Sequence, residues 1–166
     1  MQNRELTFRE QVTPDDIQHV RELIDSSGFF SAAEADVAAE LVEERLAKGV
    51  KSGYYFLFAE QDGRVIGYTC FGPIACTLAS YDLFWIGVHN DFRGQGIGKE
   101  LVRRSEDIIA SLGGTRVYIE TASRGQYEPT RQFYLNCGYQ EEAMLQDFYA
   151  PGDSKVIYVK VVHSNT

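Results

Sequence analysis

The sequence predicts a single α/β domain, residues 1–166, in which about four helices flank a mixed sheet of about seven strands. The chain has 166 residues, 44% of them hydrophobic, which is enough for one domain with a sizeable core. Residues 82–122 show the pattern of a strand, a glycine-rich loop, a helix and a strand, which requires a parallel crossover. Turn signals at Asp62-Gly63 and Pro151–Asp153 predict antiparallel hairpins, so the sheet is mixed. The predicted order is β-α-α-β-β-β-α-β-α-β-β.

A strand and a helix are predicted first. Loose alternation of apolar residues indicates a strand over Leu6–Val12. Thr13 is expected to be the N-cap of the helix that follows, with Pro14 at its first position. The apolar stripe of this helix consists of Ile17, Val20 and Ile24.

The second helix has clear signals at both ends. Ser31 and Glu34 form a capping-box pattern, and Gly49 is a plausible C-terminal stop. Its predicted apolar stripe consists of Val37, Leu41 and Leu46.

Strands dominate the middle of the chain. Residues 54–59 and 65–71 flank the Asp62-Gly63 turn, and residues 82–88 form a third run that is apolar on both faces. A glycine-rich loop follows this third run. The next helix carries its apolar residues at helical spacing up to Gly113, at positions Ile97, Leu101, Ile108 and Leu112.

The C-terminal part is predicted to add three strands and one helix. Residues 116–122 should form a strand covered on both faces. A short helix is expected from about Glu128 to Cys137, with Gly138 just beyond its end. Two last strands are expected around residues 139–148 and 155–162.

Charge and composition exclude several classes of function. Sixteen Lys and Arg against 24 Asp and Glu give a formal charge of −8, which argues against a nucleic-acid partner. The polar start shows no signal peptide, and the absence of a long apolar run argues against a membrane partner. The three cysteines lack CxxC spacing, which predicts a reduced, cytoplasmic protein. The histidines are scattered, so no metal site is predicted.

The loop Arg93-Gly-Gln-Gly-Ile-Gly98 joins an apolar strand to a helix. Backbone N–H groups at a helix start lack intrahelical partners, and glycines let an anion approach them closely. Arg93 can add charge-assisted hydrogen bonds, so we favour a phosphate site over a tight turn without a ligand. A Walker loop does not fit, because Arg93 stands at its first glycine and Glu100 at its hydroxyl position. The dinucleotide pattern fails as well, because the third glycine is Gly98 instead of residue 99.

The motif that does fit is Arg-x-x-Gly-x-Gly at residues 93–98, and it resembles the pyrophosphate loop of the GNAT superfamily of acetyl-coenzyme A-dependent N-acetyltransferases. Residues 133–139, Phe-Tyr-Leu-Asn-Cys-Gly-Tyr, resemble the end of a helix that is typical of the same family. The predicted order of elements agrees over nearly the whole chain.

The resemblance implies a set of contacts with acetyl-CoA, the acyl donor. Backbone amides of the loop, at Gln95, Gly96, Ile97 and Gly98, would hold the pyrophosphate. Main-chain groups of the preceding strand, at Ile86 and Val88, would form hydrogen bonds with the pantetheine arm. Arg93 and Gly94 would shape the turn. Gly87, between the two strand positions, is read either as a bulge or as a close packing contact.

The family's tyrosine acid corresponds to Tyr134. A phenol can hydrogen-bond the departing thiolate or return a proton to it, and the alternative is a core aromatic residue. The sequence departs from the family pattern at two earlier residues, Tyr127 and Thr130, where Asn and Ala are common in the family. Thr130 is a candidate to supply a hydroxyl to the coenzyme instead.

A base must remove the proton of the amine, because an alkylammonium is almost fully protonated at neutral pH. Two carboxylates inside predicted strands are candidates, with Glu120 placed ahead of Asp82. The alternative reading is a solvated or ion-paired position for Glu120 and a turn cap for Asp82. A water relay, Glu128 and Tyr81 stay open as substitutes.

The predicted function is transfer of an acetyl group from acetyl-CoA to a primary amine of a small molecule or peptide, by direct attack in a ternary complex. A route through a cysteine is less favoured. The alternatives are a non-catalytic acyl-CoA-binding sensor or regulatory domain, and a structural domain with a vestigial loop. The identity of the acceptor, the length of the acyl group and a homodimer are left open.

Overall fold

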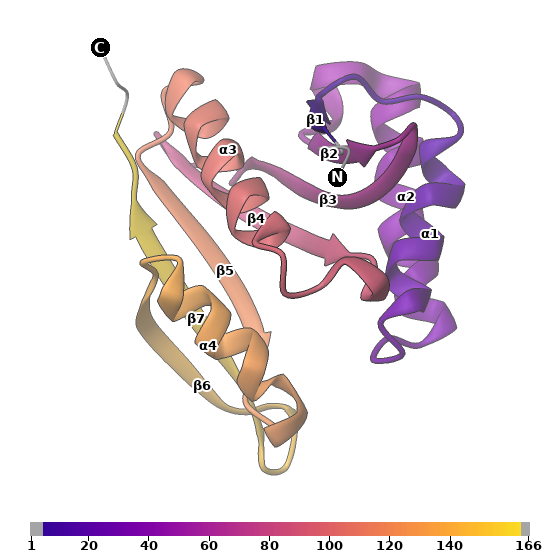
Figure 1. Ribbon diagram of the computed structural model, residues 1–166. Helices are drawn as coiled ribbons and strands as arrows, with labels where there is room; N and C mark the ends of the chain where they lie inside the picture. The colour runs from indigo at the N-terminus through magenta and orange to yellow at the C-terminus, as the bar shows by residue number, and fades with distance from the viewer. Residues whose placement is uncertain (1–4, 164–166) are drawn as a thin grey trace. The chain divides into compact units, whose positions relative to one another are not determined.

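The computed structural model describes residues 5–163, and these form a mixed seven-stranded sheet with four α-helices (Figure 1). The strands follow the order β1-β2-β3-β4-β5-β7-β6 in the sheet. The pairing of β4 with β5 is parallel, whereas β1 with β2, β2 with β3, β5 with β7 and β6 with β7 are antiparallel. The predicted α/β class and order of elements are therefore confirmed.

The strands are β1 (Leu6–Arg9), β2 (Tyr55–Gln61), β3 (Arg64–Pro73), β4 (Ser80–Val88), β5 (Arg116–Ala122), β6 (Gln140–Ala150) and β7 (Asp153–Val161). The helices are α1 (Asp16–Ser26), α2 (Ala32–Lys48), α3 (Ile97–Ser111) and α4 (Glu128–Asn136). Three short 3-10 helices are η1 (Gly49–Ser52), η2 (Asn90–Phe92) and η3 (Gly125–Tyr127). The β2–β3 hairpin turns at Asp62 and Gly63, which both have positive φ, as a type I′ turn requires.

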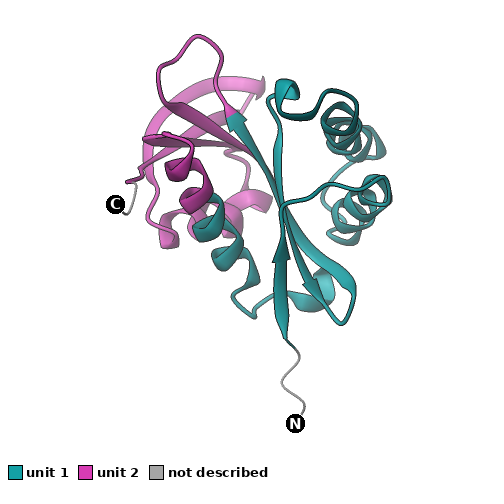
Figure 2. Cartoon of the chain, turned by 90° about the horizontal axis from the view of Figure 1, so that it is seen from above, with its two compact units in different colours: residues 1–72, 85–105 teal, residues 73–84, 106–166 magenta. Residues whose placement is uncertain are grey.

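The chain divides into two compact units (Figure 2). The first comprises the chain up to Gly72 together with Trp85–Ser105, and the second comprises Pro73–Phe84 together with the chain from Glu106 onward. The first unit holds β1–β3, α1, α2 and the glycine loop, and the second holds β5–β7 and α4.

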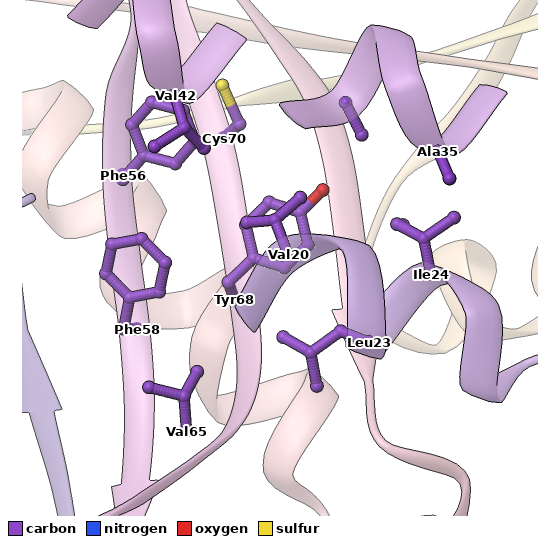
Figure 3. Packing of buried hydrophobic residues seen from close by; sticks show 11 residues of the cluster. Val20, Leu23, Ile24, Ala35, Val42, Phe56, Phe58, Val65, Tyr68 and Cys70 are labelled. Carbon is purple, nitrogen blue, oxygen red and sulfur yellow. The ribbon is translucent and has the colours of Figure 1, made fainter. Parts of the chain in front are cut away.

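The first unit is built around one hydrophobic cluster, in which α1 and α2 cover aromatic residues of β2 and β3 (Figure 3). Phe56, Phe58 and Tyr68 stack at centroid distances of 5.8–6.4 Å. The face that α2 buries is rich in alanine, because Ala35, Ala38, Ala39 and Val42 are all buried. The predicted stripe is wrong for Val37 and Leu46, which are exposed, because α2 buries the face that carries its alanines and Val42 instead.

The start of α1 also differs from the prediction. The strand ends at Arg9 and the helix begins at Asp16, later than Pro14. The Thr13 side chain does not accept from the helix; instead, the Thr13 N–H donates to Asp16 Oδ2 at 2.8 Å. Asp16 is fully buried and also accepts two hydrogen bonds from Arg9, at 2.8 and 2.9 Å. In α2 the predicted capping is confirmed, because Ser31 Oγ accepts from the Glu34 N–H at 3.2 Å.

The second unit has one buried face on β5 and β7. Residues 117, 119 and 121 of β5 are buried, whereas Glu120 is exposed, so the expectation that this strand is covered on both faces is wrong. The buried face packs against the tyrosines of α4 and its C-terminal end, Tyr134 and Tyr139. Glu106 of α3 accepts from Tyr139 Oη at 3.0 Å and from Lys160 Nζ at 2.8 Å. Gly138 ends α4 at φ 92°, as predicted.

Candidate functional site

The glycine loop lies in the first unit, at the N-terminus of α3. Gly94 and Gly96 have φ of 77° and 78°, and a Cβ at either would meet nothing within 4 Å. The backbone there is left-handed and open, which explains the glycines. The first helical hydrogen bond after the loop runs from the Glu100 N–H to the Gly96 carbonyl at 3.1 Å. The N–H groups of residues 97–99 therefore precede the helix's own ladder and can donate to an anion.

The core anchors one end of this loop and leaves the rest exposed. Ile97 is 4% exposed, whereas Arg93, Gly94, Gln95 and Gly96 are all exposed. The Arg93 guanidinium lies over the ring of Phe29, 5.9 Å from its centroid. The preceding turn is tied to α1, because the Asn90 N–H donates to Ser26 Oγ at 3.2 Å. The exposed arginine and the open backbone beside it are accessible to an anion.

The strand before the loop has one partly open edge. Parallel pairing of β4 with β5 runs from Ser80 with Arg116 to Asp82 with Tyr118, although β4 continues to Val88. Ile86 and Val88, the predicted contacts of the pantetheine arm, lie in the part of β4 beyond this pairing, and both are half-buried. Gly87 is a close packing contact, because a Cβ there would lie 3.1 Å from Cε1 of Tyr68.

The two candidate bases lie in the second unit, on one face of the sheet. Asp82 pairs with Tyr118, and Glu120 stands two residues further along β5, so the strand alternation gives them the same side. Lys155 shares this face through its pairing with Ala122. Burial and the negative charge of Glu120 raise the pKa of Asp82 to about 6, against the opposing effect of Lys155.

Glu120 has a different environment from Asp82. Its side chain is 47% exposed and its Oε2 lies 2.9 Å from Lys155 Nζ. The same ammonium lies over the Phe148 ring, 4.0 Å from the centroid. Glu120 is therefore engaged by a cation, which leaves Asp82 as the carboxylate whose charge is least stabilised.

Tyr134 lies on the opposite face of the sheet within the second unit. Its ring lies 5.9 Å from that of Tyr158, which pairs with Ile119 and so points away from the Glu120 side. Tyr134 is 6% exposed, and burial raises the pKa of its phenol well above the usual range. The phenol is thus protonated at neutral pH. Thr130, one turn earlier on α4, is half-buried.

Two residues of interest here were not predicted from the sequence. The β5–β7 register places Lys155 close enough to Glu120 to form an ion pair, and no local sequence pattern predicts this contact. In the sequence, Tyr68 looks like an ordinary core aromatic residue of a strand, and only the packed structure shows that its side chain is fully buried in the hydrophobic cluster. Within residues 5–163, no cluster of His, Cys, Asp and Glu is arranged to hold a metal ion. No helix in the same part of the chain has the length and apolar character to cross a membrane.

Comparison with known proteins gives one consistent family. The profile of the acetyltransferase (GNAT) family matches residues 17–139. An uncharacterized N-acetyltransferase of Methanocaldococcus jannaschii is 28% identical over 146 residues, which cover 79% of this chain and 88% of the relative.

Solved structures agree with the family match. A candidate GNAT acetyltransferase from Desulfovibrio desulfuricans superposes with a TM-score of 0.93 at 41% identity, covering 95% of this chain and 99% of the other. The PaiA N-acetyltransferase of Thermoplasma acidophilum, solved with coenzyme A, superposes with a TM-score of 0.72 at 20% identity, covering 95% and 99%. At that identity the likeness concerns the fold alone.

Proposed function

The chain belongs to the acetyltransferase (GNAT) family and is an acetyltransferase, and we propose that it transfers the acetyl group of acetyl-CoA directly to a primary amine. The observation that carries this proposal is the glycine loop, which combines the N–H groups of residues 97–99 at the start of α3, two left-handed glycines and the exposed Arg93. Such an arrangement suits a diphosphate better than a single carboxylate, because it offers several donors and a guanidinium.

The coenzyme fits the residues present. The amides of Gln95, Gly96, Ile97 and Gly98 would bind the pyrophosphate, and the main chain of Ile86 and Val88 would pair with the amides of the pantetheine arm. When bound, the thioester supplies an activated carbonyl with a good leaving group. The chain's own contribution is to orient this carbonyl along β4 and to polarise it with a backbone N–H.

We assign the base to Asp82. Its pKa of about 6 makes it deprotonated yet basic enough to accept a proton near neutral pH. Glu120 is held by Lys155 and supplies a negative charge beside Asp82. During transfer the nitrogen–carbon bond forms, the carbon–sulfur bond breaks, and the proton lost by the amine passes to the Asp82 carboxylate.

Tyr134 is the proposed acid for the departing thiolate. The protonated, buried phenol can donate a hydrogen bond or a proton at neutral pH. Thr130 is proposed as a further contact of the coenzyme.

The acceptor is proposed to be an amine of a small molecule or a peptide. The cluster of Asp82, Glu120 and Lys155 has a net negative charge when both carboxylates are ionised, which favours a cationic amine over an anionic acceptor. The formal charge of −8 speaks against a nucleic-acid acceptor.

Calorimetric titration tests the donor site. Acetyl-CoA should bind, whereas S-acetylpantetheine, which carries the same thioester but no phosphate, should bind far more weakly. Equal binding of the two would contradict the role of the glycine loop. Release of free thiol from acetyl-CoA in the presence of a panel of primary amines then tests transfer, and no amine-dependent release in a protein that binds acetyl-CoA would contradict the proposed reaction.

A further inference from the structure

The hydroxyl of Tyr68 is a polar group inside the hydrophobic cluster of the first unit. Tyr68 is 0% exposed, and among the described residues its Oη finds no hydrogen-bond partner. Burying a hydroxyl without a partner is costly, and the ring alone would pack as well without it. Phenylalanines already occupy the neighbouring positions Phe56 and Phe58 in the same stack. The hydroxyl therefore needs an explanation other than packing.

Strand alternation gives the hydroxyl a defined side of the sheet. A Cβ at Gly67 would lie 3.0 Å from Leu101 Cδ1, so residue 67 faces α3, the helix that begins at the glycine loop. Tyr68 points to the opposite side, among residues of α1 and α2. It thus lies on the face away from the proposed pyrophosphate site.

The ring of Tyr68 crosses the backbone of β4 at Gly87. A Cβ at Gly87 would lie 3.1 Å from Cε1 and 3.4 Å from Cδ1, so the hydroxyl end of the ring makes the closer approach. Figure 3 shows the hydroxyl directed away from Phe56 and Phe58, toward the side of Ile24 and Ala35. Because β4 is next to β3 in the sheet, the hydroxyl end of the ring lies near the part of β4 that contains Ile86 and Val88.

We propose that the Tyr68 hydroxyl binds the amine acceptor, as a hydrogen-bond partner of the reacting nitrogen beside Gly87. This inference rests on the proposed acetyl transfer. The phenol is neutral, because burial raises its pKa, so its oxygen can accept an N–H of the amine and leave the nitrogen lone pair for the carbonyl. Phe30 and Trp85, in edge-to-face contact at 5.4 Å, are partly buried against the same cluster.

The substitution Tyr68→Phe removes this oxygen and keeps the ring. We expect the free energy of unfolding to stay the same or to rise, because no internal hydrogen bond is lost. Tyr139→Phe is the matched control, because its hydroxyl donates to Glu106 at 3.0 Å and its loss should destabilise the protein.

Activity is measured with acetyl-CoA and n-butylamine, by the thiol released. We expect Tyr68→Phe to lower kcat/KM for n-butylamine by about tenfold or more, the cost of one lost hydrogen bond to a buried group, and to leave the affinity for acetyl-CoA unchanged. Full activity of the variant would overturn the assignment. A loss of stability as large as that of Tyr139→Phe would overturn it too, because it would reveal an internal partner. Inactivity of the wild type toward the whole amine panel would instead reject the proposed function.

Discussion

Asp82 and Glu120 are two carboxylates on one face of the sheet that differ in what surrounds them. Asp82 is half-buried and carries the raised pKa, whereas Glu120 is half-exposed and ion-paired with Lys155. Glu120 was placed first from the sequence because it lies beside the predicted parallel crossover, where the resemblance to the family implies a cleft. We therefore propose the reverse ranking, because the pKa of Asp82 is raised toward neutrality whereas Glu120 is ion-paired with Lys155.

The pH dependence of turnover separates the two carboxylates. With Asp82 as base, kcat/KM should rise with pH through about 6 and then level off, because only the ionised carboxylate accepts a proton. Asp82→Asn should remove this acidic limb and lower kcat/KM by roughly 10²–10⁴-fold. Glu120→Gln should keep the limb and move its midpoint to lower pH, because the neighbouring negative charge is gone. The opposite pattern would transfer the role to Glu120.

A substitution at Gly96 tests the role of the loop by adding a single methyl group. Gly96→Ala should cost about 1 kcal/mol of stability through the left-handed backbone and weaken binding of acetyl-CoA by at least about tenfold, one lost charge-assisted contact. Gly63→Ala is the matched control, because Gly63 has a similar φ of 75° and equally open surroundings in the β2–β3 hairpin. Calorimetry with acetyl-CoA measures both variants, and equal affinities for them would remove the loop from the binding site.

At the scale of elements, α1 is joined to the sheet by buried charge. Asp16 accepts hydrogen bonds from Arg9 of β1, from His19 of the same helix and from the Thr13 N–H. Arg9 in turn donates to Glu60 of β2 at 2.7 Å. Burial alone would raise the pKa of Asp16, but these donors outweigh it and lower the pKa. The network fixes the start of α1 where the sequence suggested a simple Thr13 cap.

Asp16→Asn should therefore destabilise the protein at neutral pH by about 3 kcal/mol, because it leaves the Arg9 charge without its partner. The stabilisation belongs to the ionised form, so it is complete above the ordinary aspartate pKa and is lost as pH falls through the lowered one. Urea unfolding at pH 7 and at successively lower pH should show the difference from wild type shrinking. Asp36→Asn, at an exposed ion pair with Arg21, should change stability far less than Asp16→Asn. Equal effects of the two variants would contradict a special role for Asp16.

At the scale of the whole molecule, the candidate site residues are distributed over both compact units. The glycine loop and Tyr68 belong to the first unit, and Asp82, Glu120 and Tyr134 belong to the second. The family match over residues 17–139 includes parts of both. β4 and α3, which flank the glycine loop, each contribute residues to both units.

Local sequence alone determined the order of elements, the two hairpin turns, the Ser31 cap, the glycine loop and the family. These features depend on backbone conformation and on residues a few positions apart, so short patterns carry them. The first turn of α1 was less well predicted, because a partner outside the helix, Arg9 of β1, binds Asp16 there.

Only the tertiary structure shows that the pKa of Asp82 is raised, that Glu120 is ion-paired, and that the Tyr68 hydroxyl is buried without a hydrogen-bond partner among the described residues. Lys155 reaches Glu120 through the pairing of β5 with β7, and Tyr68 meets Gly87 across neighbouring strands. The choice of the alanine-rich face of α2 as the buried one belongs to the same category, because it depends on which residues pack against the helix. Burial and charge pairing depend on residues that are distant in the sequence and close in space, so no local pattern can specify them.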